Sequence, residues 1–398
     1  MRPKSTELIH HAYEAPSGFD SMVPGVHKAS TVLFKDMAAL RARTWKEKTG
    51  YTYGLHGTPT TFTLEERIAT LEGGLQTLLA PSGLAAIALV DQALLKSGDE
   101  VLIPDNAYGP NRELARNELA GWGITHRTYD PMDTAAFEAA IGPRTKLAWI
   151  EAPGSVTMEF PDVAALARIA RARGVTSALD ITWAAGLAFD AFDLLPGQGD
   201  APLAVDVAVQ ALTKYPSGGG DVLMGSVTTR DLALHLALKM AHMRLGIGVG
   251  ANDAEAVLRS LPSLDLRYEA QDRAGRTLAA WWAARPEIVQ LLHPAFETSP
   301  GHAHWKAHCT RAAGLFSVVF DDRYTSVQVD AFCDALRLFG LGYSWAGPMS
   351  LVVPYDLGML RTNAAWRGTL VRFSVGLEAV DDLIADCEQA LAALHAIV

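Results

Sequence analysis

The chain has 398 residues, of which 49% are hydrophobic and 20% charged, and its formal net charge is −10. This composition excludes a disordered chain and predicts a folded protein of two or three domains. The negative charge argues against nucleic acid as a partner, because nucleic-acid-binding proteins usually carry a basic surface. No uninterrupted apolar run is long enough to cross a bilayer, so the sequence predicts no membrane partner either.

The N-terminus and the cysteines both indicate a cytoplasmic protein. Residues 1–11 are polar and lack the apolar stretch of a secretory signal. The three cysteines, Cys309, Cys333 and Cys387, are widely spaced and form no CxxC pattern. Isolated thiols in a reducing compartment explain them better than a disulfide framework or a zinc site, so we expect no bound metal.

The first 250 residues contain most of the predicted strands. Residues 1–60 are polar and interrupted by glycine and proline, which predicts an extended arm that lies against a neighbouring subunit. A helix is expected from Thr63 until Gly73 and Gly74 end it. Strands are then expected at 77–80, 101–104, 146–151, 177–180 and 205–210, and helices at 84–95, 111–121 and 163–173. This alternation predicts a mostly parallel sheet covered on both faces.

The C-terminal part has a different pattern. Beyond residue 250 the chain is helix-rich, with a few strands expected near 315–320 and 370–375. We interpret residues 251–398 as a smaller C-terminal α/β domain, residues 61–250 as the α/β domain that contains the main sheet, and residues 1–60 as the arm.

The most informative segment is an apolar strand that ends in Thr213-Lys214-Tyr215, followed by a glycine-rich turn. A lysine at a buried strand end is costly unless it is bonded or paired. A Schiff base with an aldehyde cofactor removes that cost and makes the amine a catalytic group. The alternative is an exposed lysine at a strand-to-loop junction, which is the commoner situation for lysine in general.

Three upstream segments favour the cofactor interpretation. Asp180 ends an apolar strand, where open α/β sheets bind ligands, and an acid suits the pyridine nitrogen of pyridoxal 5′-phosphate (PLP). Ser82 and Gly83 open a helix, and N–H groups at a helix N-terminus suit a phosphate. Tyr108 follows the next strand and can stack on a flat ring. Taken singly, each also has an ordinary interpretation, as a loop acid, a helix cap and a half-buried aromatic.

Taken in this order, the segments resemble the Cys/Met-metabolism family of PLP-dependent enzymes, which includes cystathionine β-lyase, cystathionine γ-synthase, cystathionine γ-lyase and methionine γ-lyase. The match runs from about Thr31 to the C-terminus. The resemblance implies PLP as the cofactor and the PLP-dependent transferase fold of type I, which is aspartate aminotransferase-like. It also implies that residues 61–250 bind the cofactor, that an amino acid is the substrate, and that the protein is a homo-oligomer, a dimer of dimers.

The resemblance also implies the site residues. The residues implied to bind the cofactor are Lys214 (as a Schiff base), Asp180, Thr182, Gly83, Leu84, Thr213, Tyr108 and Tyr53. Catalytic roles are implied for Lys214, Tyr108 and Tyr53, and the last resembles an arm tyrosine that enters the neighbouring subunit's site.

Substrate binding is implied for Arg372, Ser344, Trp345 and Ser155. A guanidinium group suits a carboxylate because it offers two parallel N–H donors. The alternative for Arg372 is a structural ion pair with an acid such as Glu378.

Within the family, the chain is most similar to cystathionine β-lyase. Three features carry this similarity: the segment Glu-Ala-Pro-Gly-Ser-Val-Thr-Met-Glu at 151–159, Trp183 after the ring aspartate, and the Ser344-Trp345 turn. They imply a C–S β-lyase, which performs α,β-elimination on a sulfur amino acid and releases a thiol, pyruvate and ammonia. A γ-acting relative of the synthase or γ-lyase type is the alternative, and a non-enzymatic protein that kept the fold is a third interpretation.

The chain also departs from the family pattern. Leu55 stands where the family has a phosphate-binding arginine, and Ala211 where it has a serine. Both changes predict weaker phosphate binding unless Arg112 or His56 compensates. Met349 replaces an acid after the Ser-Trp turn, a change near the substrate rather than the cofactor.

Overall fold

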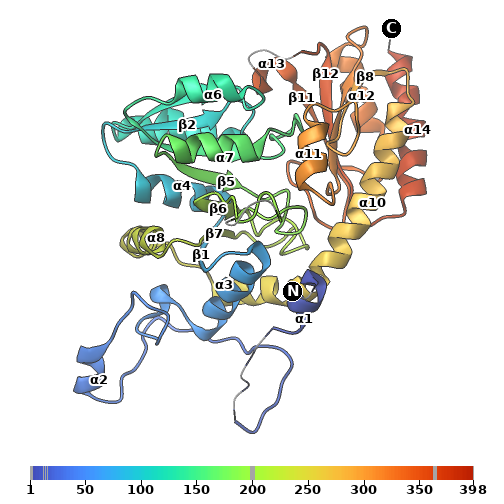
Figure 1. The fold of residues 1–398 in the computed structure, drawn as a ribbon. Helices are drawn as coiled ribbons and strands as arrows, with labels where there is room; N and C mark the ends of the chain where they lie inside the picture. Colours follow the sequence, from blue (N-terminus) through green and yellow to red (C-terminus); the bar gives the residue numbers. More distant parts are fainter. Residues whose placement is uncertain are drawn as a thin grey trace.

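Two β-sheets organise the chain (Figure 1). The computed structural model describes residues 3–11, 13, 15, 17–197, 202–361 and 365–397. The larger sheet has the strand order β1-β7-β6-β5-β4-β2-β3. Its strands are β1 (Gln76–Ala80), β2 (Glu100–Pro104), β3 (Thr125–Tyr129), β4 (Thr145–Glu151), β5 (Thr176–Asp180), β6 (Val207–Gln210) and β7 (Gly225–Thr229). β7 runs antiparallel to both of its neighbours, and the other strands all point the same way.

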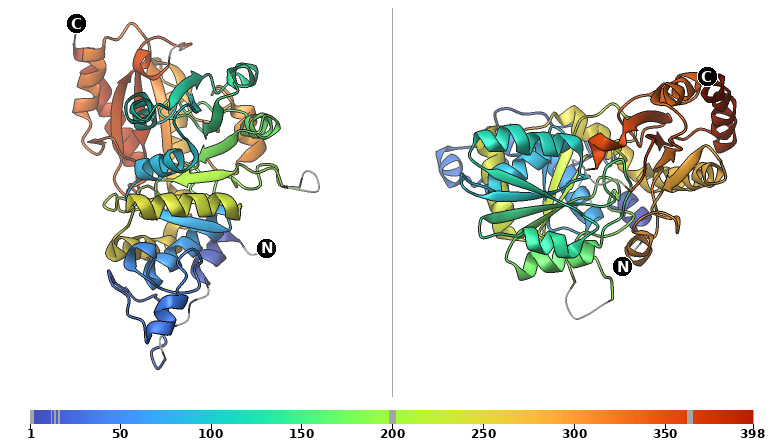
Figure 2. Two further views of the ribbon diagram at one scale, coloured as in Figure 1. Left: turned by 90° about the vertical axis from the view of Figure 1, so that its left-hand side faces the viewer. Right: turned by 90° about the horizontal axis from the view of Figure 1, so that it is seen from above.

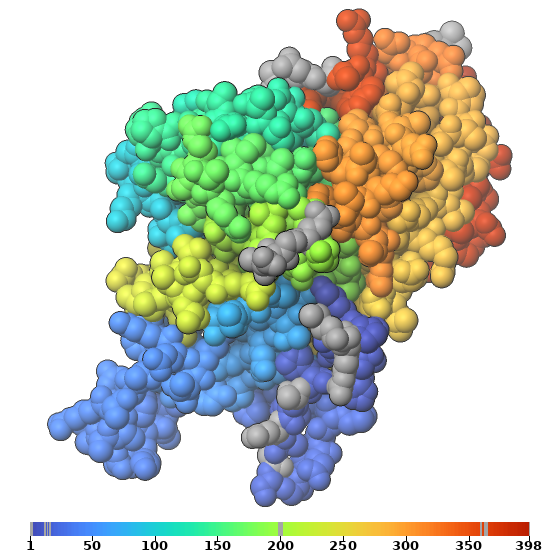
Figure 3. Space-filling model, in the orientation of Figure 1, coloured from blue at the N-terminus to red at the C-terminus, as the bar shows by residue number. Residues whose placement is uncertain are grey.

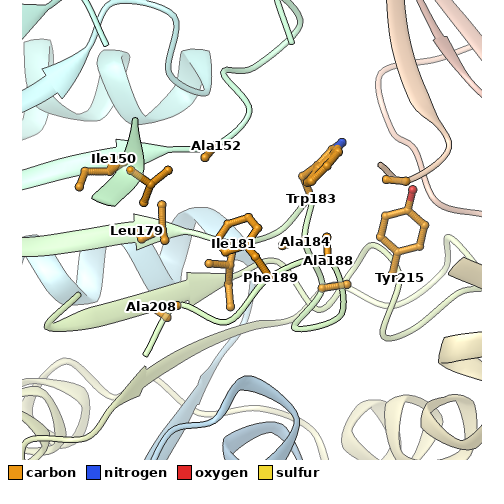
Figure 4. Close-up of a cluster of buried hydrophobic side chains, with 14 of the residues drawn as sticks. Ile150, Ala152, Leu179, Ile181, Trp183, Ala184, Ala188, Phe189, Ala208 and Tyr215 are labelled. Carbon is orange, nitrogen blue, oxygen red and sulfur yellow. The ribbon is translucent and has the colours of Figure 1, made fainter. Parts of the chain in front are cut away.

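Helices cover both faces of the larger sheet. One face is covered by α4 (Gly83–Leu94), α5 (Gly109–Leu114), η2 (Ala115–Leu119) and α8 (Leu232–Leu245), and the other by α3 (Pro59–Glu72), α6 (Thr134–Ala140) and α7 (Val163–Ala172). Successive side chains of a strand point to opposite faces, so a central strand must be apolar on both. In β4, Leu147 and Trp149 pack on the α4 side, whereas Ile150 packs on the α7 side with Leu179 and Ala208 of the next two strands (Figure 4).

The smaller sheet has the order β10-β11-β12-β9-β8 and lies beside the larger one, as Figure 2 shows. Its strands are β8 (Ile288–Leu292), β9 (Leu315–Phe320), β10 (Gly340–Leu341), β11 (Leu351–Asp356) and β12 (Thr369–Ser374). Helices α10 (Leu264–Ala283), α12 (Ser326–Ala335) and α14 (Val380–Ala396) cover one face around the fully buried Trp282, Phe316 and Phe373. Further helical segments are α9 (Ala251–Ser260), η3 (Leu261–Ser263), α11 (His302–His308) and α13 (Leu357–Leu360).

The N-terminal segment contacts its own subunit at one end and projects from it elsewhere. In α1 (Lys4–Ile9), the Lys4 ammonium group donates to the backbone carbonyls of Leu71 and Gly186. The part around α2 (Met37–Ala42) extends away from the sheets (Figure 3) and leaves Leu33 90% exposed. The arm's contact with a neighbouring subunit and the domain boundaries at 60 and 250 stay predictions.

The prediction of a mostly parallel sheet with a smaller C-terminal sheet is confirmed. The strands predicted for the larger sheet are present, with ends within two residues of the predicted ones. Strands β3 and β7 were not predicted from the sequence, and neither were β8, β10 and β11 of the smaller sheet. The first two have a clear reason. β3 is an edge strand with the sequence Thr-His-Arg-Thr-Tyr, and β7 is Gly-Ser-Val-Thr-Thr. Neither has the apolar periodicity from which strands are predicted.

A buried arginine links the two sheets. Arg361 follows α13, which lies between the two sheets in Figure 1. Its Nη1 lies 2.5 Å from Asp105 Oδ1 and 3.1 Å from Asp130 Oδ1, and its Nη2 lies 2.8 Å from Glu159 Oε1. These acids follow β2, β3 and β4, so one guanidinium group from the smaller sheet holds three loops of the larger one.

Replacing Arg361 with methionine should therefore destabilise the fold. The change leaves three neighbouring carboxylates without a countercharge, and we expect a loss of about 3 kcal/mol in the free energy of urea unfolding at pH 7. The control is Arg116→Met, at an exposed pair with Glu113, which should cost less than about 1 kcal/mol. Equal losses in the two variants would contradict a linking role for Arg361.

Candidate active site

One cavity lies where the carboxyl ends of the larger sheet's strands meet the smaller sheet. It has a volume of about 280 Å³. The predicted site residues that line it are Gly83, Leu84, Tyr108, Ser155, Asp180, Thr182, Thr213, Lys214, Trp345 and Arg372. Ser344 joins them through a hydrogen bond to Lys214. Since parallel strands that point the same way end at one edge, residues far apart in the sequence converge there.

Lys214 follows β6, and its amine is held between two residues of the smaller sheet's turn. Its Nζ donates to Ser344 Oγ at 3.0 Å and lies 5.5 Å from the centre of the Trp345 ring. Burial, together with the nearby Arg372 guanidinium and against the attraction of Asp180, lowers the pKa of this ammonium group to about 8. The lysine thus offers neutral amine, the form that attacks an aldehyde, at a pH where an exposed lysine stays charged.

Asp180 is the last residue of β5. Its Oδ1 accepts the backbone N–H of Thr182 at 2.9 Å. Burial raises the pKa of Asp180, and the hydrogen bonds from Thr182 and the charge of Lys214 oppose this effect. The Thr182 hydroxyl accepts the backbone N–H of Ala211 at 2.9 Å, so it fixes the segment that leads to Lys214 beside the end of β5.

The N-terminus of α4 faces the cavity and suits an anion. Ser82 Oγ caps the helix by accepting the N–H of Ala85 at 3.0 Å, and within the described residues the N–H groups of Gly83 and Leu84 have no acceptor. A Cβ at Gly83 would lie 2.6 Å from the Cβ of Ala211, so glycine is what allows the helix end to approach this closely. Free N–H groups at a helix N-terminus bind phosphate well.

Thr213, the predicted hydroxyl donor to the phosphate, has another partner in this structure. Its hydroxyl donates to the carbonyl of Met224 at 3.2 Å and accepts the N–H of Met224 at 3.1 Å. Thr213 lines the cavity, but its contact with a phosphate stays a prediction.

Arg372, in β12, is buried and has no acid partner. Its residue is 6% exposed, its Nη2 donates to the Ser344 carbonyl at 3.3 Å, and its Nε has no hydrogen-bond partner. Among the described residues, no carboxylate forms an ion pair with it. Glu378, the structural alternative, instead accepts from the backbone N–H and the hydroxyl of Ser350 at 2.7 and 2.8 Å. A buried guanidinium at a cavity wall needs an anion from outside the chain.

Sequence analysis missed Glu151 as part of the site. It is the last residue of β4 and lies in register with Asp180 at the end of β5. Its Oε2 accepts the backbone N–H of Tyr108 at 2.7 Å. Burial raises the pKa of Glu151 well above its ordinary value, and the charge of Asp180 adds to this effect. The sequence contained a pattern that could have identified Glu151, because two neighbouring predicted parallel strands both end in an acid.

Tyr53 lies outside the cavity of its own subunit. It is 45% exposed, and its hydroxyl accepts from Ser30 Oγ at 3.3 Å. Leu55 and His56, which follow it, line a separate small pocket beside α8. His56 and Arg112, the two residues considered as replacements for the phosphate arginine, are both absent from the cavity wall that the structure describes.

Three further observations concern metals, membranes and thiols. Among the residues that the structure describes, no three histidine, cysteine or acidic side chains cluster in a way that could hold a metal ion. In the same part of the chain no helix has the length and apolar character of a membrane span. The three cysteines are buried and free.

Comparison with known proteins identifies the family. The model of the family described as Cys/Met metabolism PLP-dependent enzyme matches residues 5–392. The chain belongs to this family. It is 38% identical to a putative cystathionine beta-lyase of Rhizobium johnstonii, covering 99% of this chain and 97% of that protein, and 36% identical to a cystathionine beta-lyase of Bordetella avium, covering 96% of each. A solved cystathionine gamma synthase from Xanthomonas oryzae matches with a TM-score of 0.88 and 25% identity over 100% of both chains.

The enzyme therefore has the type I fold and depends on PLP, as the sequence predicts. The cavity fits the cofactor. The α4 N-terminus would hold the phosphate, Asp180 would pair with the ring nitrogen, and Lys214 would form the Schiff base. These assignments account for the free N–H groups of α4 and for the lysine buried in the cavity wall.

The rate at which the cofactor-free protein takes up PLP should follow the neutral amine of Lys214. Since burial brings the pKa of this group to about 8, we expect the rate to rise with pH through a midpoint near 8. Arg372→Leu should move the midpoint upward, because a repelling cation is removed. Borohydride trapping and mass spectrometry of the Lys214 peptide measure the rate, with exposed Lys146 as internal control. A midpoint near that of free lysine, at about 10.4, would refute the assignment.

Proposed function

We propose that this enzyme is a carbon–sulfur β-lyase, similar to cystathionine β-lyase, that acts on a cysteine thioether. The reaction breaks the Cα–H and Cβ–S bonds, consumes one water and yields a thiol, pyruvate and ammonium. The observation that carries the proposal is Arg372, a buried guanidinium without an acid partner in the same cavity as the Lys214 amine. The carboxylate of an amino acid supplies the anion that this site lacks.

Each step that the protein performs has a residue in the cavity. The Arg372 guanidinium binds the α-carboxylate and so fixes Cα, while bound PLP supplies the electron sink that makes the Cα proton acidic. The Lys214 amine takes that proton, and the resulting ammonium group can deliver it to the departing sulfur. Ser344 orients both cations, since its hydroxyl accepts from Lys214 and its carbonyl accepts from Arg372.

The comparisons support β-elimination more than γ-chemistry. The relatives named cystathionine beta-lyase are 31–38% identical to this chain, whereas an L-methionine gamma-lyase of Pseudomonas putida is 30% identical and the gamma synthase structure 25%. A γ-acting enzyme is the alternative, and it must also remove a proton at Cβ. The products separate the two, because β-elimination of cystathionine releases pyruvate and γ-elimination releases 2-oxobutanoate.

We also propose that the arm of one subunit completes the cavity of its neighbour, so that the smallest active unit is a dimer and two dimers form a tetramer. The position of Tyr53 outside its own cavity and the projecting arm in Figure 3 support this arrangement. The free, buried cysteines support a cytoplasmic location.

The substitution Arg372→Lys tests the proposed reaction. Wild-type enzyme should release pyruvate from a cysteine thioether, and the variant should lose about 100-fold or more in kcat/KM, because lysine cannot make the two-pronged contact. PLP absorbance should be unchanged. A coupled lactate dehydrogenase assay measures pyruvate.

The control for this variant is Arg276→Lys, at an ion pair with Asp272 outside the cavity, which should retain activity. Loss of PLP or of the folded state in Arg372→Lys would favour a structural role for Arg372. A wild-type enzyme that binds PLP and releases no oxo acid from any thioether would overturn the lyase proposal.

A complementation experiment tests the shared cavity. Tyr53→Phe and Lys214→Ala chains should each be nearly inactive alone. Mixed dimers contain one cavity with both native residues, so we expect up to about half of the wild-type activity per mixed dimer. Purification with two affinity tags isolates the mixed species. Absence of recovery in verified mixed dimers would show that Tyr53 acts within its own subunit or not at all.

A further inference from the structure

One part of the cavity wall is apolar and aromatic. This part of the wall comprises Val156, Met158, Leu223, Leu315, Tyr343 and Trp345. Leu223 and Tyr343 are 70% and 80% exposed, so they form the rim, whereas Val156, Met158 and Leu315 are buried. We call these six residues the apolar wall. A substrate side chain that extends past the sulfur toward these residues would contact the apolar wall.

Two residues of the apolar wall have a strained backbone. Val156 has a φ of 65° and Met158 a φ of 53°. Such values are unfavourable for residues with side chains, above all for β-branched valine, and cost on the order of 1–3 kcal/mol each. Glycine or asparagine at these positions would relieve the strain. The chain nevertheless has bulky apolar side chains there, which both pack against the hydrophobic core and line the cavity.

The surrounding residues fix this strained turn. Ser317 Oγ of the smaller sheet donates to the Val156 carbonyl at 2.6 Å. Asn106 donates to the Thr157 hydroxyl and to Glu159, each at 3.1 Å, and Glu159 is held by Arg361. Contacts from both sheets therefore hold Val156 and Met158 in the cavity wall.

Each charged side chain of the described cavity wall has a hydrogen-bond partner or a role assigned above. In the described part of the wall they are Lys214, Asp180, Arg372 and Glu151. Lys214 and Asp180 serve the cofactor, Arg372 serves the α-carboxylate, and Glu151 accepts the Tyr108 N–H. Around Tyr53 of the arm, residues 51–55 are the uncharged Tyr-Thr-Tyr-Gly-Leu.

We propose that, among cysteine thioethers, the enzyme selects those with an uncharged alkyl or aryl group on sulfur, and that Val156 and Met158 determine this selectivity. The inference rests on the proposed β-lyase reaction. A second ammonium and carboxylate at the far end of the substrate would lose their hydration and gain no charged partner from the apolar wall. An alkyl or aryl group would instead bury apolar surface there.

A matched pair of substrates tests the selectivity. S-propyl-L-cysteine is L-cystathionine without its distal amino and carboxylate groups. We expect kcat/KM for S-propyl-L-cysteine to exceed that for cystathionine by about tenfold or more, measured by pyruvate release from the holoenzyme. Equal or better turnover of cystathionine would overturn the selectivity while leaving the lyase reaction intact.

The substitution Val156→Asn tests the residue assignment. Asparagine tolerates the positive φ, so the turn is kept while the wall becomes polar. The preference for S-propyl-L-cysteine over cystathionine should fall several-fold, and Val289→Asn, at an exposed site on β8 outside the cavity, should leave the ratio unchanged. A purely structural role for Val156 would lower kcat/KM for both substrates alike, and that result would overturn the assignment.

Binding of non-cleavable analogues separates selectivity from the reaction. L-2-aminoheptanoate and L,L-2,7-diaminosuberate are the same two molecules with CH₂ in place of sulfur. The holoenzyme should bind the first about tenfold more tightly or better, as followed by calorimetry or by the fluorescence of Trp183 and Trp345 in the cavity. This result would support the selectivity even if neither thioether released pyruvate, in which case only the proposed reaction would fail. Equal affinity for the two analogues would overturn the selectivity.

Discussion

Two buried cations share one cavity, and the rest of the site depends on how their charge is accommodated. Lys214 and Arg372 both line the cavity, and each lowers the stability of the other's charged form because like charges repel strongly away from water. Asp180 attracts Lys214, but among the described residues no carboxylate forms an ion pair with Arg372, and Glu378 is bonded to Ser350. Ligands would remove the remaining cost, since an aldehyde would convert the lysine to a Schiff base and a substrate carboxylate would pair with the arginine.

The cavity is held by contacts between the two sheets. Strand ends of the larger sheet bring Asp180, Glu151 and the segment before Lys214 to one edge, and β12 brings Arg372 to it from the smaller sheet. The Arg361 ion pairs and the bond from Ser317 to the Val156 carbonyl then fix the strained turn between them. The favourable contacts needed to hold two residues at positive φ are thus the same ones that join the sheets.

Much of the fold and many of the site residues could be predicted from the sequence. What could not be predicted was missed for physical reasons. Periodicity shows where an apolar strand ends, so Lys214, Asp180 and Gly83 could be placed at one edge of a parallel sheet. Strand β3 is a mostly exposed, polar edge strand and β7 buries small and polar side chains, so neither shows an apolar pattern. Roles that depend on tertiary contacts could not be predicted from the sequence. The Thr213 hydroxyl bonds to Met224, and Arg361 meets its three acids across more than 200 residues of sequence, which no local pattern reveals. The strain at Val156 likewise exists only in the folded chain.

Leu55, which departs from the family pattern, bears on both phosphate binding and the charge of the cavity. In the family pattern an arginine at this arm position binds the cofactor phosphate, and here the free N–H groups of the α4 N-terminus, brought close by Gly83 and Ala211, are the donors that face the cavity. Backbone donors and a helix dipole can hold a phosphate without a side-chain cation. If the arm enters a neighbour's cavity as proposed, Leu55 would also bring no cation there that could attract a second substrate carboxylate. Leucine at this position is therefore consistent both with phosphate binding by α4 and with the proposed preference of the apolar wall for uncharged groups.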